Sequence, residues 1–222
     1  QVPALIEDRI WDRSALVRLE RVDGLHRLVI LRPDGSEQAI GFDDPAYAIE
    51  LPPEQSYAAS SVMIVHQSPK SPRRWIRVDL ASGKQTIVQQ QKVANFDPGD
   101  YEVERLFAPA HDGEMVPITL VSRRGSPKDG KAPLLQYGYG SYGVPSDPEF
   151  SIPALALVDR GWRYAIAHVR GGSEKGRQWF LAGRKFTKRT SFTDFIACAE
   201  YLAAENYTAK GKVVAYGLSA GG

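Results

Sequence analysis

The sequence predicts a chain in two parts, an all-β part over residues 1–99 and an α/β part over residues 100–222. In the first part, short runs of β-branched and aromatic residues alternate with tight-turn signals, and no helical stretch lies between them. In the second part, strand-like and helix-like segments alternate, which is typical of a mostly parallel sheet covered by helices. The chain closes with Gly-x-Ser-x-Gly directly after a β-branched run. This order is typical of the strand-to-helix turn of an α/β-hydrolase.

The all-β part consists of predicted strands joined by short turns. We expect strands at 15–22, 28–31, 37–40, 60–65, 74–80 and 85–88. Asp23-Gly24 is a hairpin signal between the first two strands, and Ser82-Gly83 is a turn signal before the last. A meander of such strands favours propeller blades, although a β-sandwich would show nearly the same pattern.

The α/β part is predicted to begin near residues 95–100, where the composition changes. It opens with a hairpin of strands at 103–109 and 116–121. Further strands are expected at 133–137, 164–169 and 213–214, with helices at 154–160 and 190–202. One apolar stripe runs along the second helix, formed by Phe192, Phe195, Ile196, Ala199 and Leu202.

Composition and charge are those of an ordinary globular domain. The 222 residues carry a formal net charge of +2, which gives no reason to expect a nucleic-acid or anionic-membrane partner. A single cysteine, Cys198, excludes an internal disulfide framework and permits a reducing compartment. We therefore expect a cytoplasmic location, with the periplasm as the alternative. The chain starts at Gln1 and stops just after the Gly-x-Ser-x-Gly pattern, so we expect a fragment that lacks both ends of a longer protein.

Ser219 is the candidate nucleophile, because the Gly-x-Ser-x-Gly turn exposes a serine hydroxyl above the sheet. The backbone N–H of Ala220 is then one expected oxyanion donor. Tyr139, in a loop with glycines at alternate positions, can donate a second hydrogen bond, or can pack there for its area alone. In α/β-hydrolases the acid and the histidine follow the serine, so both are expected beyond this chain. The four histidines present all precede Ser219.

Three other residues have predicted structural roles. Arg170 and Glu174 are expected to form an ion pair that orders a loop beside the site. Cys198 lies between apolar helix positions and is expected to be a buried small hydrophobe. The sequence shows no metal-ligand cluster and no phosphate-binding loop, so no cofactor is expected.

Several motifs in one order together resemble the prolyl oligopeptidase family of serine peptidases. They are Tyr-Gly-Tyr-Gly-Ser-Tyr-Gly at 137–143, Asp-Arg-Gly-Trp at 159–162, His-Val-Arg-Gly-Gly-Ser-Glu-Lys-Gly at 168–176 and Gly-Leu-Ser-Ala-Gly-Gly at 217–222. The Ser-Tyr-Gly variant, with acidic residues just after it, is more similar to the oligopeptidase B branch than to the proline-specific members.

The resemblance implies a seven-bladed β-propeller capping an α/β-hydrolase domain, with the last blades and the first part of the hydrolase in this chain. It implies hydrolysis of short basic peptides after lysine or arginine, through an acyl-enzyme. Ser219 would be the nucleophile, Tyr139 the side-chain oxyanion donor, and Tyr142 would line the substrate pocket. Asp147 and Glu149 match an acidic pair that binds a basic residue next to the cleavage site, although aspartate is expected where Glu149 stands. The carboxylates of the primary pocket would lie downstream of this chain. The remainder of the same hydrolase domain would supply the triad aspartate and histidine.

Other interpretations remain open at this point. Asp147 and Glu149 can equally belong to a solvated acidic loop. The protein can be another α/β-hydrolase of the wider family, such as a prolyl or acylaminoacyl peptidase or an esterase. It can also be a non-catalytic binding protein based on the propeller.

Overall fold

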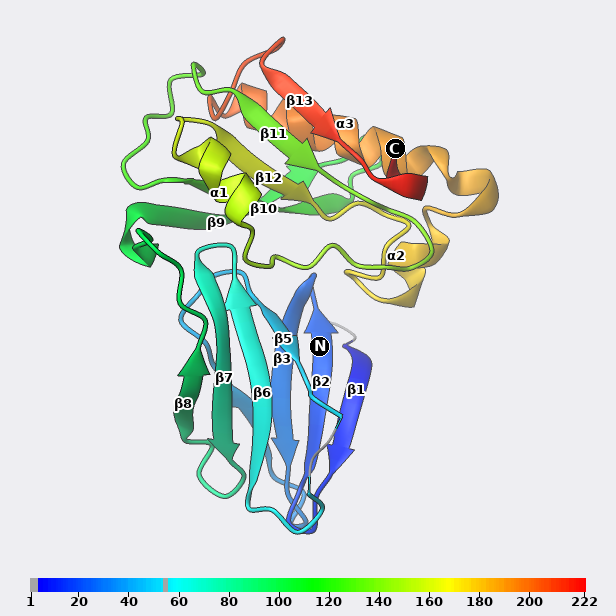
Figure 1. Ribbon diagram of the computed structural model, residues 1–222. Coiled ribbons are helices and arrows are strands. Elements are labelled where there is room, and N and C mark those ends of the chain that lie inside the picture. The colour runs from blue at the N-terminus through cyan, green and yellow to red at the C-terminus, as the bar shows by residue number, and fades with distance from the viewer. Residues whose placement is uncertain (1–3, 54–55) are drawn as a thin grey trace.

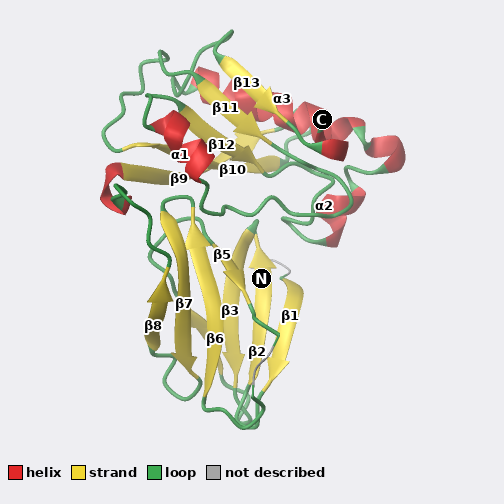
Figure 2. Cartoon of the chain, viewed as in Figure 1, coloured by secondary structure: helices red, strands yellow, loops and turns green. Residues whose placement is uncertain are grey.

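The computed structural model describes residues 4–53 and 56–222 and folds into three β-sheets (Figure 1). Two four-stranded sheets lie beneath a five-stranded sheet, and the α-helices surround only the five-stranded sheet (Figure 2). Residues 1–3 and 54–55, which belong to the predicted all-β part, lie outside the described residues.

The first sheet contains β1 (Leu5–Trp11), β2 (Leu16–Val22), β3 (Leu25–Leu31) and β4 (Glu37–Ile40), each antiparallel to the next. Asp23 and Gly24 both have positive φ, +48° and +80°. A type I′ turn needs positive φ at both central residues, so the Asp-Gly pair sets the β2–β3 hairpin as predicted. The strand β1 was not predicted.

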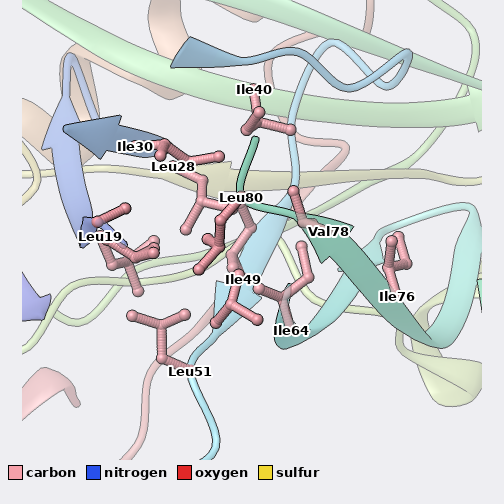
Figure 3. Close-up of a cluster of buried hydrophobic side chains, with 13 residues drawn as sticks. Leu19, Leu28, Ile30, Ile40, Ile49, Leu51, Ile64, Ile76, Val78 and Leu80 are labelled. Carbon is pink, nitrogen blue, oxygen red and sulfur yellow. The ribbon is translucent and has the colours of Figure 1, made fainter. Parts of the chain in front are cut away.

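The second sheet contains β5 (Ala48–Glu50), β6 (Ser61–Ser68), β7 (Ser71–Asp79) and β8 (Gln85–Gln90), again in sequence order. β6 and β7 are longer than predicted, because only Pro69 and Lys70 turn between them. The two sheets share one apolar core with side chains from both, shown in Figure 3. This core includes Leu28 and Ile30 from β3, and Ile64 from β6, all fully buried.

The third sheet has the order β13-β11-β12-β10-β9. Its strands are β9 (Tyr101–Pro109), β10 (Met115–Arg123), β11 (Leu134–Tyr137), β12 (Arg163–Ala167) and β13 (Val213–Tyr216). β11 is parallel to β12 and to β13, whereas β10 is antiparallel to β12 and to β9. The prediction of a mostly parallel sheet is therefore wrong for the described residues, because the β9–β10 hairpin adds two antiparallel pairings to two parallel ones.

Helices cover both faces of this third sheet. α1 (Ile152–Val158) packs against Val121, whereas α3 (Arg189–Ala204) covers the face that carries Val116 and Ile118. These β10 residues point to opposite faces because side chains alternate along a strand. A short α2 (Arg177–Leu181) and the 3₁₀ turns η1 (Pro98–Asp100), η2 (Lys185–Thr187) and η3 (Ser219–Gly221) complete the chain.

The predicted apolar stripe of α3 is partly wrong. Phe192 and Ile196 are half exposed, at 51% and 50%, whereas Asp194 is fully buried. The buried face instead follows Ser191, Asp194, Cys198 and Leu202, which recur at i, i+3, i+7 and i+11. The helix is rotated because Asp194 binds a buried arginine. None of the helices in the described ranges combines the length and the apolar character that a membrane crossing needs.

Candidate active site

The Gly-x-Ser-x-Gly segment forms a tight turn at the carboxyl end of β13. Ser219 has φ +53°, in the left-handed region that residues other than glycine seldom adopt. A Cβ on Gly217 would lie 2.2 Å from the carbonyl oxygen of Gly221, so the turn closes only with glycine there. Ser219 is exposed.

The loop at 137–143 lies directly against this turn. β11 and β13 are parallel neighbours, with Tyr137 paired to Tyr216, so both segments leave the same edge of the sheet. A Cβ on Gly221 would lie 3.0 Å from Cα of Tyr139, which shows how closely the two backbones approach. Tyr139, Gly217 and Gly221 line one cavity of about 320 Å³. The structure thus brings Tyr139 and the Ser219 turn together.

Tyr142 and Ala220 line a second cavity, of about 350 Å³, on the other side of the loop. Tyr142 is 78% exposed and has φ +58°. The N–H of Gly143, next to it, donates to the carbonyl of Gly171 at 2.9 Å. The loop therefore presents the Tyr142 ring to solvent beside Ala220.

Asp147 and Glu149 differ in their contacts, because Asp147 binds an arginine of the first sheet. Asp147 Oδ1 accepts a hydrogen bond of 2.6 Å from Nη1 of Arg21, whose side chain is buried. The same guanidinium also binds Glu7 through Nε and Nη2. Among the described residues Glu149 forms no ion pair, and its pKa is raised by withdrawal from water and by the charge of Asp147. The two carboxylates are thus unequal, since only Glu149 lacks a bound cation.

Arg170 does not pair with Glu174, contrary to the prediction. Its Nη2 donates to Asp194 Oδ1 at 2.6 Å and its Nε donates to Asp194 Oδ2 at 2.9 Å. The outer side of the guanidinium binds Asp112, on the β9–β10 turn. The hydrogen bonds that Arg170 donates to Asp194 raise the pKa of Arg170, so this arginine stays charged.

Glu174 is instead a buried carboxyl at the boundary between the sheets. Its Oε1 accepts from the backbone N–H of Ser146 at 3.0 Å, and burial raises its pKa to about 7. The backbone carbonyl oxygen of Glu174 accepts from the N–H of Gly24 at 2.7 Å, so the β2–β3 turn contacts the loop that carries Glu174. A Cβ at position 172 would lie 2.1 Å from Oε2 of Glu174, so any larger residue there would displace this carboxyl.

Three of the four histidines, His26, His66 and His168, are buried, whereas Ser219 is exposed. His168 is fully buried, and its Nε2 is 2.9 Å from Thr119 Oγ1. Burial and the nearby charges of Arg105 and Arg21 lower the pKa of His168. His26 and His66 lie on β3 and β6, in the first two sheets.

Cys198 is buried within α3, and burial raises the pKa of its thiol. It is therefore a packing residue, as predicted. Within the part of the chain that the structure describes, no group of His, Cys, Asp or Glu side chains could hold a metal ion.

Sequence reasoning missed Lys188. Its Nζ donates to the carbonyl oxygen of Gly140 at 2.6 Å and to Ser141 Oγ at 2.8 Å, in the loop that carries Tyr139. The only sequence signal was the excess of basic residues at 184–189, which equally describes a solvated surface.

Comparisons with known proteins agree with this arrangement. Residues 148–222 match the family model described as the prolyl oligopeptidase family. The chain is 41% identical over 204 residues to dipeptidyl aminopeptidase BI of Pseudoxanthomonas mexicana, covering 91% of this chain and 28% of that protein. It is 39% identical to protease 2 of Moraxella lacunata, covering 95% of this chain and 30% of the relative.

Solved structures show the same similarity. The oligopeptidase B structure from Leishmania major superposes with a TM-score of 0.90 at 33% identity, covering 99% of this chain and 32% of that one. The oligopeptidase B structure from Trypanosoma brucei, with covalently bound antipain, superposes with a TM-score of 0.89 at 38% identity. It covers 98% of this chain and 32% of that one. The chain thus spans about three-tenths of the length of these relatives. The identity of 41% to dipeptidyl aminopeptidase BI and the match of residues 148–222 to the family model show that the chain belongs to the prolyl oligopeptidase family.

Proposed function

We propose that the protein containing this chain is a serine oligopeptidase in which Ser219 attacks the peptide carbonyl. The observation that carries the proposal is the Ser219 turn, with its positive φ and with Tyr139 packed against Gly221. A backbone strained at one exposed serine, beside a cavity, is typical of a catalytic nucleophile.

The proposed reaction proceeds through an acyl-enzyme. Attack by Ser219 Oγ creates negative charge on the carbonyl oxygen, which the N–H of Ala220 and the hydroxyl of Tyr139 would stabilise. The leaving amine then departs, and water hydrolyses the ester. We assign the base and its orienting acid to sequence that follows Ser219, because His168 is buried against Thr119.

We further propose the domain division at residues 99 and 100. β8 ends at Gln90 and β9 begins at Tyr101, and no strand pairing between described residues crosses this boundary. The two four-stranded meanders would be the last blades of a propeller, and residues 100–222 the first part of the hydrolase domain. The match to the prolyl oligopeptidase family model, over residues 148–222, lies wholly after this boundary.

For specificity we propose that cleavage follows lysine or arginine, that the carboxylates of the primary pocket lie in sequence after Ser219, and that a substrate cation next to the cleavage site binds Glu149. Its negative charge is free, whereas Asp147 already binds Arg21. A carboxylate pairs with a lysine or arginine side chain, and equally with the α-ammonium of a short peptide. The second binding mode would make the protein a dipeptidyl aminopeptidase, as the relative from Pseudoxanthomonas mexicana is named.

One experiment separates these activities. The full-length protein is incubated with a fluorophosphonate probe, and the labelled residue is mapped, with Ser219→Ala as the control. Cleavage is then compared between benzoyl-arginyl amide, whose amino end is blocked, and dipeptidyl amides with a free amino end. We expect Ser219 to be labelled and the blocked arginyl amide to be cleaved.

The outcomes against the proposal are specific. Cleavage restricted to free dipeptidyl amides would establish the exopeptidase instead. Turnover of acyl esters with no cleavage after lysine or arginine would reject basic specificity. An unlabelled Ser219 would indicate a binding protein without catalysis.

A further inference from the structure

Lys188 is an ammonium group that is bound by neutral oxygens. Its Nζ donates to Gly140 O at 2.6 Å, to Ser141 Oγ at 2.8 Å and to Ser191 Oγ at 3.3 Å. Within residues 4–53 and 56–222 no carboxylate forms an ion pair with it, and withdrawal from water lowers its pKa. A lysine held in this way is costly, because its partial desolvation is not offset by an opposite charge.

Ser141 connects this lysine to the turn of the nucleophile. Its Oγ accepts from Lys188 and donates to the carbonyl oxygen of Ala220 at 3.0 Å. A hydroxyl has one donor and two acceptor positions, so it can serve both neighbours at once. Ser141 is only 8% exposed, which keeps water from replacing either bond.

The link ends on the residue that we assign as the backbone oxyanion donor. Ala220 is the central residue of η3, where the N–H of Gly221 bonds to Leu218 O at 2.9 Å and that of Gly222 to Ser219 O at 3.1 Å. The bond from Gly222 holds the Ser219–Ala220 peptide group, which carries the N–H of Ala220. The bond from Ser141 holds the next peptide group, through the Ala220 carbonyl, and so fastens this turn to the 137–143 loop that carries Tyr139.

We propose that Lys188 and Ser141 are positioning residues that hold Ala220 in the orientation required for its N–H to bind the oxyanion. The positive charge of Lys188 polarises the Ser141 hydroxyl and strengthens its bond to Ala220, because charge-assisted hydrogen bonds are the stronger kind. Lys188 lies between η2 and α3, so the contact also ties the 137–143 loop to the start of α3. This inference rests on the proposed function of Ser219.

The test uses Ser141→Ala and Lys188→Met in the full-length protein, with Thr193→Ala as a matched control. The Thr193 hydroxyl donates to Thr190 O at 3.1 Å, within α3, and Thr193 lines neither of the two cavities beside the turn. Three quantities are measured: kcat for the best amide substrate, Ki for a peptide aldehyde of the same sequence, and Ki for the acid product. The aldehyde forms a tetrahedral adduct that needs the oxyanion donors, and the product acid does not.

We expect both variants to lower kcat about tenfold, less than the roughly 100- to 1000-fold loss on removing an oxyanion donor itself. The aldehyde Ki should rise by the same factor, while the product Ki stays within about twofold. The double variant should lose no more than either single variant, because both residues act through one contact. Thr193→Ala should change none of these quantities.

Two results would overturn the inference. An unchanged kcat in both variants would show that Ala220 is held without them. Equal losses of aldehyde and product affinity would indicate general disruption of the site. If Ser141→Ala fails to fold, Lys188→Met tests the same link from its other end. Absence of activity in the wild type would instead reject the proposed function.

Discussion

Replacing Asp194 with asparagine should destabilise the hydrolase part strongly, because this carboxylate is the buried half of an ion pair. Asp194 is fully buried, and Arg170 is 5% exposed. Asp194 Oδ2 accepts from both the Nε and the backbone N–H of Arg170, at 2.9 and 3.0 Å. Asparagine presents an NH₂ group in place of one oxygen, so at least one buried donor loses its acceptor.

The size of the destabilisation by Asp194→Asn follows from the burial of the Asp194 carboxylate. Removing one partner of a buried pair leaves an uncompensated charge, which costs about 3–5 kcal/mol. Asp112 binds the same guanidinium, but its side chain is 55% exposed. Asp112→Asn is therefore the matched control, and an exposed pair contributes only about 0–1 kcal/mol. Each variant replaces a carboxylate that binds Arg170 with an amide, and the two replaced side chains differ in burial.

The assay is thermal and urea unfolding of the full-length protein, followed by tryptophan fluorescence. Trp179 is a suitable reporter, because its ring lies 5.6 Å from the Arg170 guanidinium carbon. At about 2–4 °C per kcal/mol for a domain of 150–250 residues, Asp194→Asn should lower the Tm by roughly 6–20 °C. Asp112→Asn should lower it by about 4 °C at most. Equal shifts in the two variants would refute the reasoning from burial.

Three further predictions concern the turn, a buried acid and the cysteine. Gly217→Ala should abolish activity while retaining the fold, because its Cβ would lie 2.2 Å from Gly221 O; wild-type kcat would contradict the closeness of that turn. The pKa of Glu174 is raised by burial from 4.5 to about 7, so the folded state holds a proton that the unfolded state releases, and stability should fall as pH rises between these values. Glu174→Gln should remove that slope in urea titrations between pH 4.5 and 7, and an unchanged slope would assign it to other groups. Cys198 should resist iodoacetamide until the protein unfolds, as followed by peptide mass spectrometry, and rapid native labelling would disprove its burial.

Much of the local structure could be predicted from sequence because it depends on residues close in the chain. The Asp23-Gly24 pair specifies its hairpin through positive φ, and β-branched runs predicted β2, β7 and β13. The Ser219 turn was identified in the same way, since Gly217 is required by contacts to Gly221 and Gly222, within five residues.

The partners of charged side chains could not be predicted in this way. The sequence favoured Glu174 for Arg170, four residues away, but the structure pairs Arg170 with Asp194, 24 residues away, and with Asp112, 58 residues away. The same contact turned Asp194 inward and exposed Phe192, which contradicted the apolar stripe of α3. The apolar periodicity of a sequence predicts a buried face from apolar residues alone. It cannot predict that a polar side chain such as Asp194 is buried on that face, because this depends on its distant partner Arg170.

The sequence by itself determined the strands, the turns and the exposed serine with its tyrosine-bearing loop, because backbone conformation follows from local sterics and turn chemistry. Only the tertiary structure decided which carboxylate stays free and what holds Ala220. Arg21 reaches Asp147 across 126 residues, and Lys188 reaches Ser141 across 47. Such contacts exist only after the sheets have packed, because it is the packed sheets that bring these distant side chains within hydrogen-bond distance.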